Sequence, residues 1–266
     1  MPVNGSKAEA DFLLRAERAA LIAPGTPAAK EPLRFAERLF RAQAEMASAL
    51  LASHAREPLS GVLSGDAKAV IAGGRPLLEA VARDAPAPLA QAARERQGED
   101  AGRFEARLEV YWSGDLLSRD DYLSRAVLRP YCAILSAFSL QPDRPRTAAG
   151  CPFCGGAPAV SVRRPDGDTT RRLLCCGLCG GEWPVNRIRC PACGEEDPPR
   201  LPTFQTETYP AARIEACDTC MRYVKSIDLS RDGRPIPEVD ELASLGLDLW
   251  AGEQGYARIE PGLAGL

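Results

Sequence analysis

Cysteine is the residue type in this sequence whose number and spacing could do chemistry. Eight of the ten cysteines form Cys-x-x-Cys pairs: Cys151 with Cys154, Cys176 with Cys179, Cys190 with Cys193, and Cys217 with Cys220. Two intervening residues let the backbone turn so that both sulfur atoms face one ion, as in a metal-binding knuckle. A glycine after the second cysteine tolerates the positive φ of such a turn. The fourth pair lacks this glycine and is followed by Met221.

The spacing between the pairs predicts two similar metal modules. The first two pairs are separated by 21 residues (155–175) and the last two by 23 residues (194–216), enough for a short antiparallel ribbon. This internal repeat predicts one tetrahedral four-thiolate site per module, with metal binding supplying much of the folding energy. Sequential grouping of the pairs is favoured because neighbouring elements usually pair. The alternative is an interleaved grouping, in which the ribbons cross as in cross-braced zinc modules.

Thiol–disulfide exchange is the competing interpretation of the cysteine pairs. It requires a Cys-x-x-Cys in a βαβ context, which is absent here, so metal binding is favoured. A closed four-thiolate site has no position for water, which indicates a structural or electron-transfer site rather than a hydrolytic one. The sequence has no P-loop, complete dinucleotide fingerprint or nucleophile elbow. We therefore expect no catalytic residues, and no enzyme.

The remaining thiols and the sole histidine are expected to be structural. Using Cys175 as a ligand would break the spacing that Cys176 shares with the other pairs, so Cys175 is interpreted as a strand residue beside the site. Cys132 has apolar neighbours at helical spacing and is expected in the core. His54 lies on the apolar face of a predicted helix, which favours a core or boundary position over a catalytic role.

The elements that must position these modules differ between the two halves of the chain. Residues 1–140 are rich in Ala, Leu, Arg and Glu, with apolar residues at helical spacing, which predicts an all-α domain. Ser118 is the expected N-cap of its last helix. The expected helices cover about 8–22, 33–56, 66–83, 87–97, 103–112 and 119–139.

Beyond these helices the pattern becomes extended and is interrupted by glycine and proline. Short runs at 159–162, 172–175 and 213–216 are typical of small β-ribbons. A short helix is expected near 239–250. The chain is therefore predicted to be a multidomain α+β protein with two tandem small-β modules, each rubredoxin-like or zinc-ribbon-like. The expected domains are the helical domain (1–140), a surface linker (141–150), the first module (151–189), the second module (190–230) and a C-terminal helix and tail (231–266).

Composition argues against nucleic-acid and membrane partners. The 33 basic and 36 acidic residues leave a formal net charge of -3, which provides no long-range field toward phosphates or anionic lipids. A basic stripe could form only if four arginines clustered across one hairpin, the alternative being solvated strand ends: Arg163, Arg164, Arg171 and Arg172. No stretch reaches the ~18 apolar residues of a membrane span, and no signal-peptide pattern occurs. A cytoplasmic protein is expected.

Four segments carry residues that a generic zinc ribbon would not supply, such as Glu182-Trp183 and Tyr223-Val-Lys225. They are 173–183 (LLCCGLCGGEW), 190–194 (CPACG), 214–226 (IEACDTCMRYVKS) and 240–256 (DELASLGLDLWAGEQGY). In these segments the chain resembles the FdhE family, the accessory proteins of formate dehydrogenases. Met221 and the doubled Cys175-Cys176 depart from the pattern. Over the helical half the agreement is one of type and length only.

The resemblance implies a non-catalytic maturation factor that binds the catalytic subunit of a molybdenum- or tungsten-dependent formate dehydrogenase in the cytoplasm. It also implies rubredoxin-like iron sites, while four thiolates suit zinc as well. The alternatives are a thiol or iron electron-transfer protein and, after it, a nucleic-acid-binding zinc-ribbon protein. The segment 222–225 is expected to be exposed and is a candidate partner contact. Packing of Tyr223 inside the second module is the other interpretation.

Overall fold

The computed structural model of the chain describes residues 5–114, 120–230 and 232–262. Two compact units divide the chain. One unit consists of Met1–Glu17, Arg34–Pro145 and Phe153–Gly155, and the other of Arg18–Leu33, Arg146–Pro152 and Gly156–Leu266. Among the described helices, none combines the length and the hydropathy that crossing a membrane requires.

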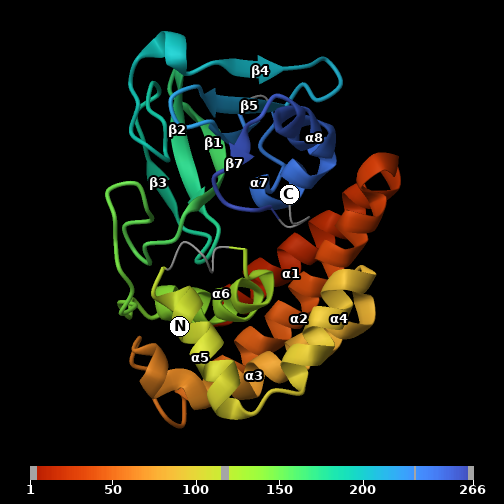
Figure 1. Cartoon of the computed structure of the whole chain (residues 1–266), viewed down its shortest axis with the longest axis vertical. Coiled ribbons are helices and arrows are strands. Elements are labelled where there is room, and N and C mark those ends of the chain that lie inside the picture. The colour runs from red at the N-terminus through yellow and green to blue at the C-terminus, as the bar shows by residue number, and fades with distance from the viewer. Residues whose placement is uncertain (1–4, 115–119, 231, 263–266) are drawn as a thin grey trace. The chain divides into compact units, whose positions relative to one another are not determined.

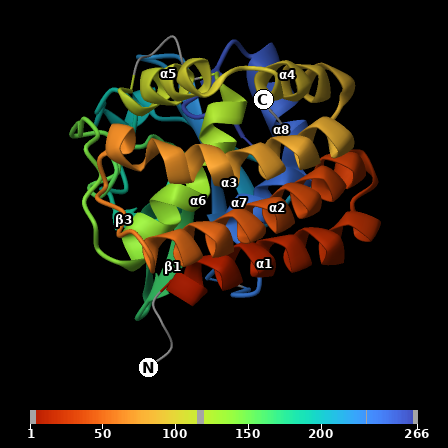
Figure 2. The same cartoon turned by 90° about the horizontal axis from the view of Figure 1, so that it is seen from below.

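Helices form the first unit, and each helix predicted from apolar spacing has a counterpart. They are α1 (Gly5–Ile22), α2 (Lys30–His54), α3 (Leu63–Asp84), α4 (Ala87–Gln97), α5 (Ala101–Trp112) and α6 (Tyr122–Ala137). Figure 2 shows α1, α2 and α3 alongside one another. The ring centroids of Phe12 on α1 and Phe40 on α2 lie 6.5 Å apart. Gln43 of α2 donates to the carbonyl of Ala126 on α6 at 2.9 Å, so a buried polar bond accompanies the apolar packing.

Helix α6 begins later than predicted. The expected N-cap, Ser118, lies outside the described residues, and the observed N-cap is Asp121. Its carboxylate accepts the backbone N–H of Ser124 at 3.1 Å, which satisfies one of the unpaired donors of the first turn. Farther along α6, Cys132 is fully buried, which confirms its assignment to the core.

The stretch expected to be a linker is tied to the helical unit by two side chains. Asp143 accepts the indole N–H of Trp112 at 2.5 Å and the backbone N–H of Leu63 at 3.3 Å. Arg144 donates from Nε to the carbonyl of Trp112 at 2.7 Å. These bonds fix the path of residues 143 and 144, and the domain boundaries drawn from the sequence stay predictions.

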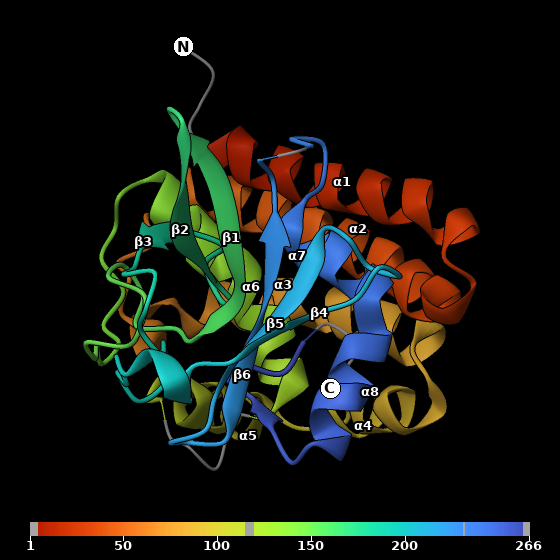
Figure 3. The ribbon, with the colours of Figure 1, turned by 90° about the horizontal axis from the view of Figure 1, so that it is seen from above.

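The described strands of the second unit form one sheet, visible in Figures 1 and 3. They are β1 (Pro158–Asp166), β2 (Thr169–Cys176), β3 (Glu182–Pro184), β4 (Thr203–Gln205), β5 (Ala212–Cys217), β6 (Arg222–Asp228) and β7 (Ala257–Arg258). Their order is β3-β2-β1-β6-β5-β4, with β7 paired to β6. Strands β1–β3 make one antiparallel meander and β4–β6 make another, which are the two predicted small-β modules.

The two modules share their sheet because the first strand of one pairs with the last strand of the other. β1 and β6 run parallel, in register from Val160 opposite Lys225 to Arg163 opposite Asp228. The side chains of Arg163 and Asp228 also form an ion pair at 2.6 Å. The tandem α+β architecture predicted from the sequence is confirmed, and the parallel joint between the modules is an addition to it.

The C-terminal helix predicted near 239–250 is present as α7 (Pro237–Asp240) and α8 (Leu245–Glu253). Leu247 and Ala251 of α8 join the buried cluster that Val160, Ile214 and Ile227 form on the sheet. The apolar face of α8 therefore closes the core that the modules have in common.

The segment 222–225 is mostly buried, so the prediction that it is exposed is wrong. Tyr223 is 3% exposed and Lys225 is fully buried. The ammonium of Lys225 pairs with Glu241 at 2.6 Å and with Asp248, and the Tyr223 hydroxyl donates to Asp248 at 2.8 Å. Arg258 of β7 pairs with the same two carboxylates. These family-like residues thus fasten the C-terminal helices to the sheet, and the packing role for Tyr223 is confirmed.

Candidate metal centres

The thiols of the four Cys-x-x-Cys pairs gather into two groups in sequential order. The first site contains Cys151, Cys154, Cys176 and Cys179, and the second site contains Cys190, Cys193, Cys217 and Cys220. In each module the antiparallel hairpin brings two cysteine pairs together, because one pair precedes the first strand and the other pair lies at the end of the second strand. The interleaved grouping does not form.

The sulfur positions fit a tetrahedral ion. Within each site the four Sγ atoms lie within 4.8 Å of one another. Individual separations are 3.6 Å between Cys151 and Cys179, 3.7 Å between Cys190 and Cys220, and 3.7 Å between Cys193 and Cys217. An ion held by four sulfurs at about 2.3 Å places the sulfurs about 3.8 Å apart. A disulfide would bring two of them to about 2.05 Å.

Backbone N–H groups point at the sulfurs, which favours thiolates. The N–H of Leu178 lies 3.3 Å from Cys176 Sγ, and that of Ala192 lies 3.4 Å from Cys190 Sγ. Three knuckles close with the same bond, from the first cysteine to the carbonyl five residues later: Cys151 to Gly156 at 2.9 Å, Cys176 to Gly181 at 2.9 Å, and Cys190 to Glu195 at 2.8 Å. Four thiolates prearranged in this way suit iron or zinc.

The residue after each knuckle adopts a positive φ, which the sequence predicted for the three glycines. The values are 70° at Gly155, 72° at Gly180, 80° at Gly194 and 53° at Met221. Met221 therefore takes the left-handed conformation without the freedom of glycine, at a cost of about 1 kcal/mol. Its side chain is 42% exposed, so little packing is gained in return.

Exposure separates the two sites. In the first site Cys151, Cys154 and Cys176 are 2%, 0% and 1% exposed, and Cys179 is half-buried. In the second site Cys190 and Cys217 are buried, Cys220 is half-buried and Cys193 is exposed. The second site thus presents one of its four sulfurs to solvent.

A carboxylate braces the two knuckles of the second site. Glu195 accepts the hydroxyl of Thr219 at 2.6 Å and the backbone N–H groups of Glu196 and Asp197 at 3.0 and 2.9 Å. These hydrogen bonds, that of Thr219 first, lower the pKa of Glu195 below its usual value. Since Thr219 lies inside the fourth knuckle and Glu195 follows the third, the bond holds the two turns together.

The thiols of the second site differ in acidity. Burial raises the pKa of the Cys190 thiol. Burial would also raise the pKa of the Cys217 thiol, but hydrogen bonds from the backbone of Cys220 and Thr219 and from the neighbouring thiols outweigh it and lower that pKa. A thiolate at this position is the form that a metal cation binds.

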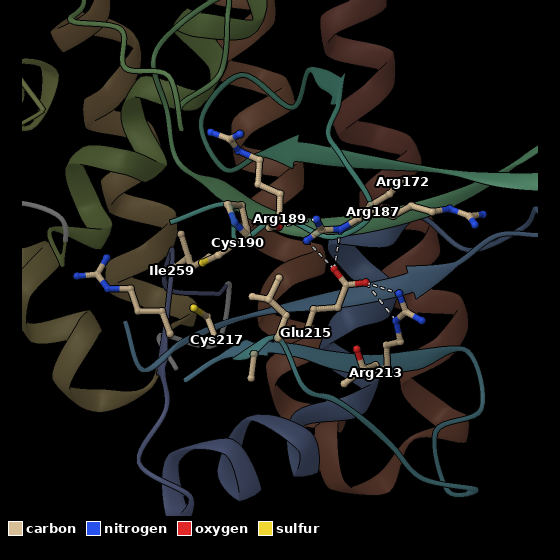
Figure 4. A pocket seen from close by; sticks show the side chains of 13 residues that line it. Arg172, Arg187, Arg189, Cys190, Arg213, Glu215, Cys217 and Ile259 are labelled. Atoms are coloured by element: carbon tan, nitrogen blue, oxygen red, sulfur yellow. Dashed lines mark hydrogen bonds and ion pairs between the residues drawn. The ribbon is translucent and has the colours of Figure 1, made fainter. Parts of the chain in front are cut away.

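A pocket borders the second site and is shown in Figure 4. Cys190 and Cys217 contribute to its wall, and five arginines surround it: Arg172, Arg187, Arg189, Arg213 and Arg222. Glu215 is the one carboxylate among the lining residues. The pocket joins the modules, because Arg172 lies on β2 and Glu215 on β5.

An ion pair between Arg172 and Glu215 lies among the residues that line this pocket. Arg172 lies 2.8 Å from Glu215 and also donates to the carbonyls of Asn186 and Arg189, at 3.0 and 2.8 Å. Burial would raise the pKa of Glu215, but the guanidinium groups of Arg172 and Arg213 outweigh it and hold that pKa below its usual value. This ion pair was not predicted from the sequence. The signal that could have found it was a charged residue of opposite sign inside each of two predicted strands, Arg172 in the run 172–175 and Glu215 in the run 213–216.

Four arginines do cluster across the β1–β2 hairpin, where Arg163 opposes Arg172 and Arg164 opposes Arg171. Each has a carboxylate partner, which is Asp228 for Arg163, Glu182 for Arg164, Asp166 for Arg171 and Glu215 for Arg172. The positive charge is therefore locally neutralised. A phosphate backbone finds no basic stripe along this hairpin.

The other residues singled out in the sequence have structural surroundings. Cys175 lies on β2, 7% exposed, with its sulfur 3.6 Å from the carbonyl of Gly180, as a strand residue beside the first site. His54 is half-buried at the end of α2. Its Nδ1 accepts the N–H of Leu59 at 2.9 Å, and its ring packs on Phe138 with centroids 4.2 Å apart. The boundary position predicted for His54 is confirmed.

Comparison with known proteins relates the cysteine half to one family. The FdhE central domain matches residues 150–187, and the FdhE C-terminal domain matches residues 188–263. A protein named FdhE homolog from Aquifex aeolicus is 36% identical over 116 residues, which are 43% of this chain and 41% of that relative. An FdhE homolog from Pseudomonas putida is 28% identical over 197 residues, which are 70% of this chain and 62% of that relative. This chain thus matches from two fifths to three fifths of the length of these relatives.

A solved structure extends the similarity to the helical half. The crystal structure of the FdhE protein from Pseudomonas aeruginosa has a TM-score of 0.67 and 27% sequence identity, over 95% of this chain and 94% of that one. The domain matches, the curated relatives and the shared structure agree with the resemblance seen in the sequence. This chain is similar to FdhE proteins in sequence over its cysteine half and in structure over 95% of its length.

Proposed function

We propose that this chain is a non-catalytic maturation factor that binds the catalytic subunit of a formate dehydrogenase in the cytoplasm and is needed for assembly of the active enzyme. The observation that carries the proposal is the presence of two four-cysteine sites on a fold shared with an FdhE protein over 95% of the chain. The similarity to FdhE proteins supplies the partner. In this proposal the chain oxidises no formate itself.

The metal ions stabilise the binding fold. All eight knuckle cysteines act as ligands, four to each ion: Cys151, Cys154, Cys176 and Cys179 in the first site, and Cys190, Cys193, Cys217 and Cys220 in the second. Each ion ties the start of a three-stranded meander to the end of its second strand. Small modules of this kind take much of their folding energy from metal binding. Iron is favoured by the family resemblance, and the sulfur geometry suits zinc as well.

Co-purification tests the partner. The tagged chain and a formate dehydrogenase catalytic subunit are produced in the same cells, beside a tag-only control. The catalytic subunit is expected in the eluate of the tagged chain alone, and cells that lack this chain are expected to lose formate dehydrogenase activity. Failure to recover the subunit, together with full activity in cells without the chain, would remove the proposal.

Electron transfer is the second candidate, and one observation favours it. Cys193 exposes a ligand sulfur of the second site, which would give an electron a short path between solvent and an iron ion there. This function predicts reversible electron uptake by the iron-loaded chain, linked to turnover of a donor enzyme. The absence of such uptake would rule out the electron-transfer function.

A further inference from the structure

The second site is accessible at one sulfur and borders a pocket. Cys193 is exposed at the surface. Cys190 and Cys217 line the arginine-rich pocket and are themselves 3% and 1% exposed, so Cys193 is the sulfur that an incoming molecule can reach. A small ligand therefore does not need the module to unfold before it approaches the sulfur of Cys193.

Two of the five arginines that line the pocket are paired with its carboxylate. Arg172 and Arg213 are engaged by Glu215, at 2.8 and 2.5 Å. The side chain of Arg222 has no ion pair or hydrogen bond among the described residues. In Figure 4 the guanidinium groups of Arg187 and Arg189 extend away from Glu215.

These outer arginines leave the pocket with more positive than negative side chains. Arg189 shares its charge with the exposed Glu196, at 2.7 Å, and Arg187 donates to the carbonyl of Thr170 at 2.6 Å. Within a Debye length of about 8 Å the remaining charge raises the local concentration of anions.

In the first site none of the four cysteines is exposed, and the most accessible, Cys179, is half-buried. Cys151, Cys154 and Cys176 are all at most 2% exposed. The knuckle is also anchored, because Arg144 donates from Nη1 to the carbonyl of Cys154 at 3.0 Å. Displacing one of these sulfurs requires local opening of the module, which adds a free-energy barrier.

We propose that the second site exchanges its metal ion with anionic chelating ligands, carboxylate- or thiolate-bearing, which the arginines of the adjacent pocket attract and which reach the ion at the exposed Cys193, while the first site retains its ion. The inference rests on the metal occupancy proposed above. A donor atom of the incoming ligand takes the place of Cys193 Sγ on the ion, and the released thiolate takes a proton from water. No electron is transferred. The chain thereby has one structural site and one exchangeable site.

Chelator kinetics on the full chain test the assignment. The chain is loaded with zinc under reducing conditions, its content is measured, and EDTA is added together with iodoacetamide. One equivalent is expected to leave at least about tenfold faster than the other, since exposed sites react without opening. Mass spectrometry should find the early alkylation on the second site only. A single release phase of two equivalents, or early alkylation at the first site, would overturn the proposal.

The role of the arginines is tested by the charge of the chelator. Replacing two of them, Arg187→Gln with Arg222→Gln, should slow the fast release to anionic EDTA by roughly threefold or more. Release to neutral 1,10-phenanthroline should keep its rate. Arg171→Gln is the matched control, since this arginine is 58% exposed on the same sheet and lies outside the pocket lining. Equal slowing with both chelators would overturn the anion route.

The zinc measurements distinguish a failure of metal binding from a failure of metal exchange. A chain that binds no zinc and carries disulfides would overturn metal occupancy at both sites. A chain that binds two equivalents and releases them together would leave occupancy intact and overturn only the exchange. Recovery of the formate dehydrogenase subunit is measured independently of either result.

Discussion

The two cysteine sites are built from the same local turns, yet they differ in access. Both place four sulfurs within 4.8 Å, and both have backbone N–H groups directed at sulfur. Three cysteines of the first site are at most 2% exposed, whereas the second site exposes Cys193 and borders a pocket. The knuckles thus determine the arrangement of the four sulfurs, and the surrounding structure determines how accessible those sulfurs are.

Strand lengths accompany this difference. The first site stands at the end of the two longest strands, β1 and β2, which have nine and eight residues. The first knuckle of the second site, Cys190 to Cys193, precedes β4, a strand of three residues at the edge of the sheet.

The largest expected effect separates the two sites by their ligands. Cys154→Ser should lower the free energy of unfolding by about 4 kcal/mol or more and release one metal equivalent, because a buried closed site loses a ligand. Cys193→Ser should cost about 1–2 kcal/mol, since its serine can be solvated. Denaturant unfolding and elemental analysis measure both.

Cys175→Ala is the control for this comparison. Cys175 adjoins the first site without being one of its four grouped sulfurs, so this variant should keep two metal equivalents. Equal losses of stability in the two serine variants would show that exposure does not distinguish the sites.

An intermediate effect is expected at the joint between the modules. Glu215→Gln leaves the buried Arg172 without its carboxylate and should cost about 3 kcal/mol at neutral pH. The pKa of Glu215 in the folded chain is held below its usual value. The stability that its charge contributes is therefore complete above about pH 4.3, and it is lost as the pH falls through the pKa of the folded state. The stability gap between wild type and the variant should therefore narrow in acid.

Thermal unfolding across pH measures this gap. Glu196→Gln is the matched control, because Glu196 pairs with Arg189 at the surface and should contribute less than about 1 kcal/mol. A gap that stays constant down to pH 3 would show that Glu215 carries no charge-dependent stability.

The smallest expected effects have opposite signs at two knuckles of the same site. Gly194→Ala should destabilise the chain by about 1 kcal/mol, because residue 194 has a φ of 80°. Met221→Gly should stabilise it by up to about 1 kcal/mol by relieving the left-handed conformation of an exposed side chain. Midpoints of denaturant unfolding compare the two, and a destabilised Met221→Gly variant would contradict the strain.

Much of the local structure could be predicted from the sequence. Apolar spacing located α1 to α6, because amphipathic helices carry a periodic pattern that survives in the sequence. The start of α6 was misplaced, since Ser118 and Asp121 are both suitable caps and only the packed helix selects one. The helix in the tail was found, and its role in covering the sheet was not.

The burial of charged residues near the sites could not be predicted from the sequence. The string from Arg222 to Lys225 reads as polar and exposed, yet Lys225 is buried against Glu241 and Asp248. Its partners lie 16 and 23 residues away along the chain. A buried ion pair of this kind has no local signature, because its second half is supplied by another element.

By itself, the sequence determined the chemistry: eight cysteines at knuckle spacing, the glycines that let three of those turns form, and the sequential order of the two sites. These properties are local, because a Cys-x-x-Cys turn and the hairpin behind it span few residues. Only the tertiary structure decided that β1 and β6 join the modules, that Arg172 meets Glu215 and that Cys193 stays open. Those properties depend on which strand edges pair and what covers them, and pairing between distant strands is set by the burial of the whole core.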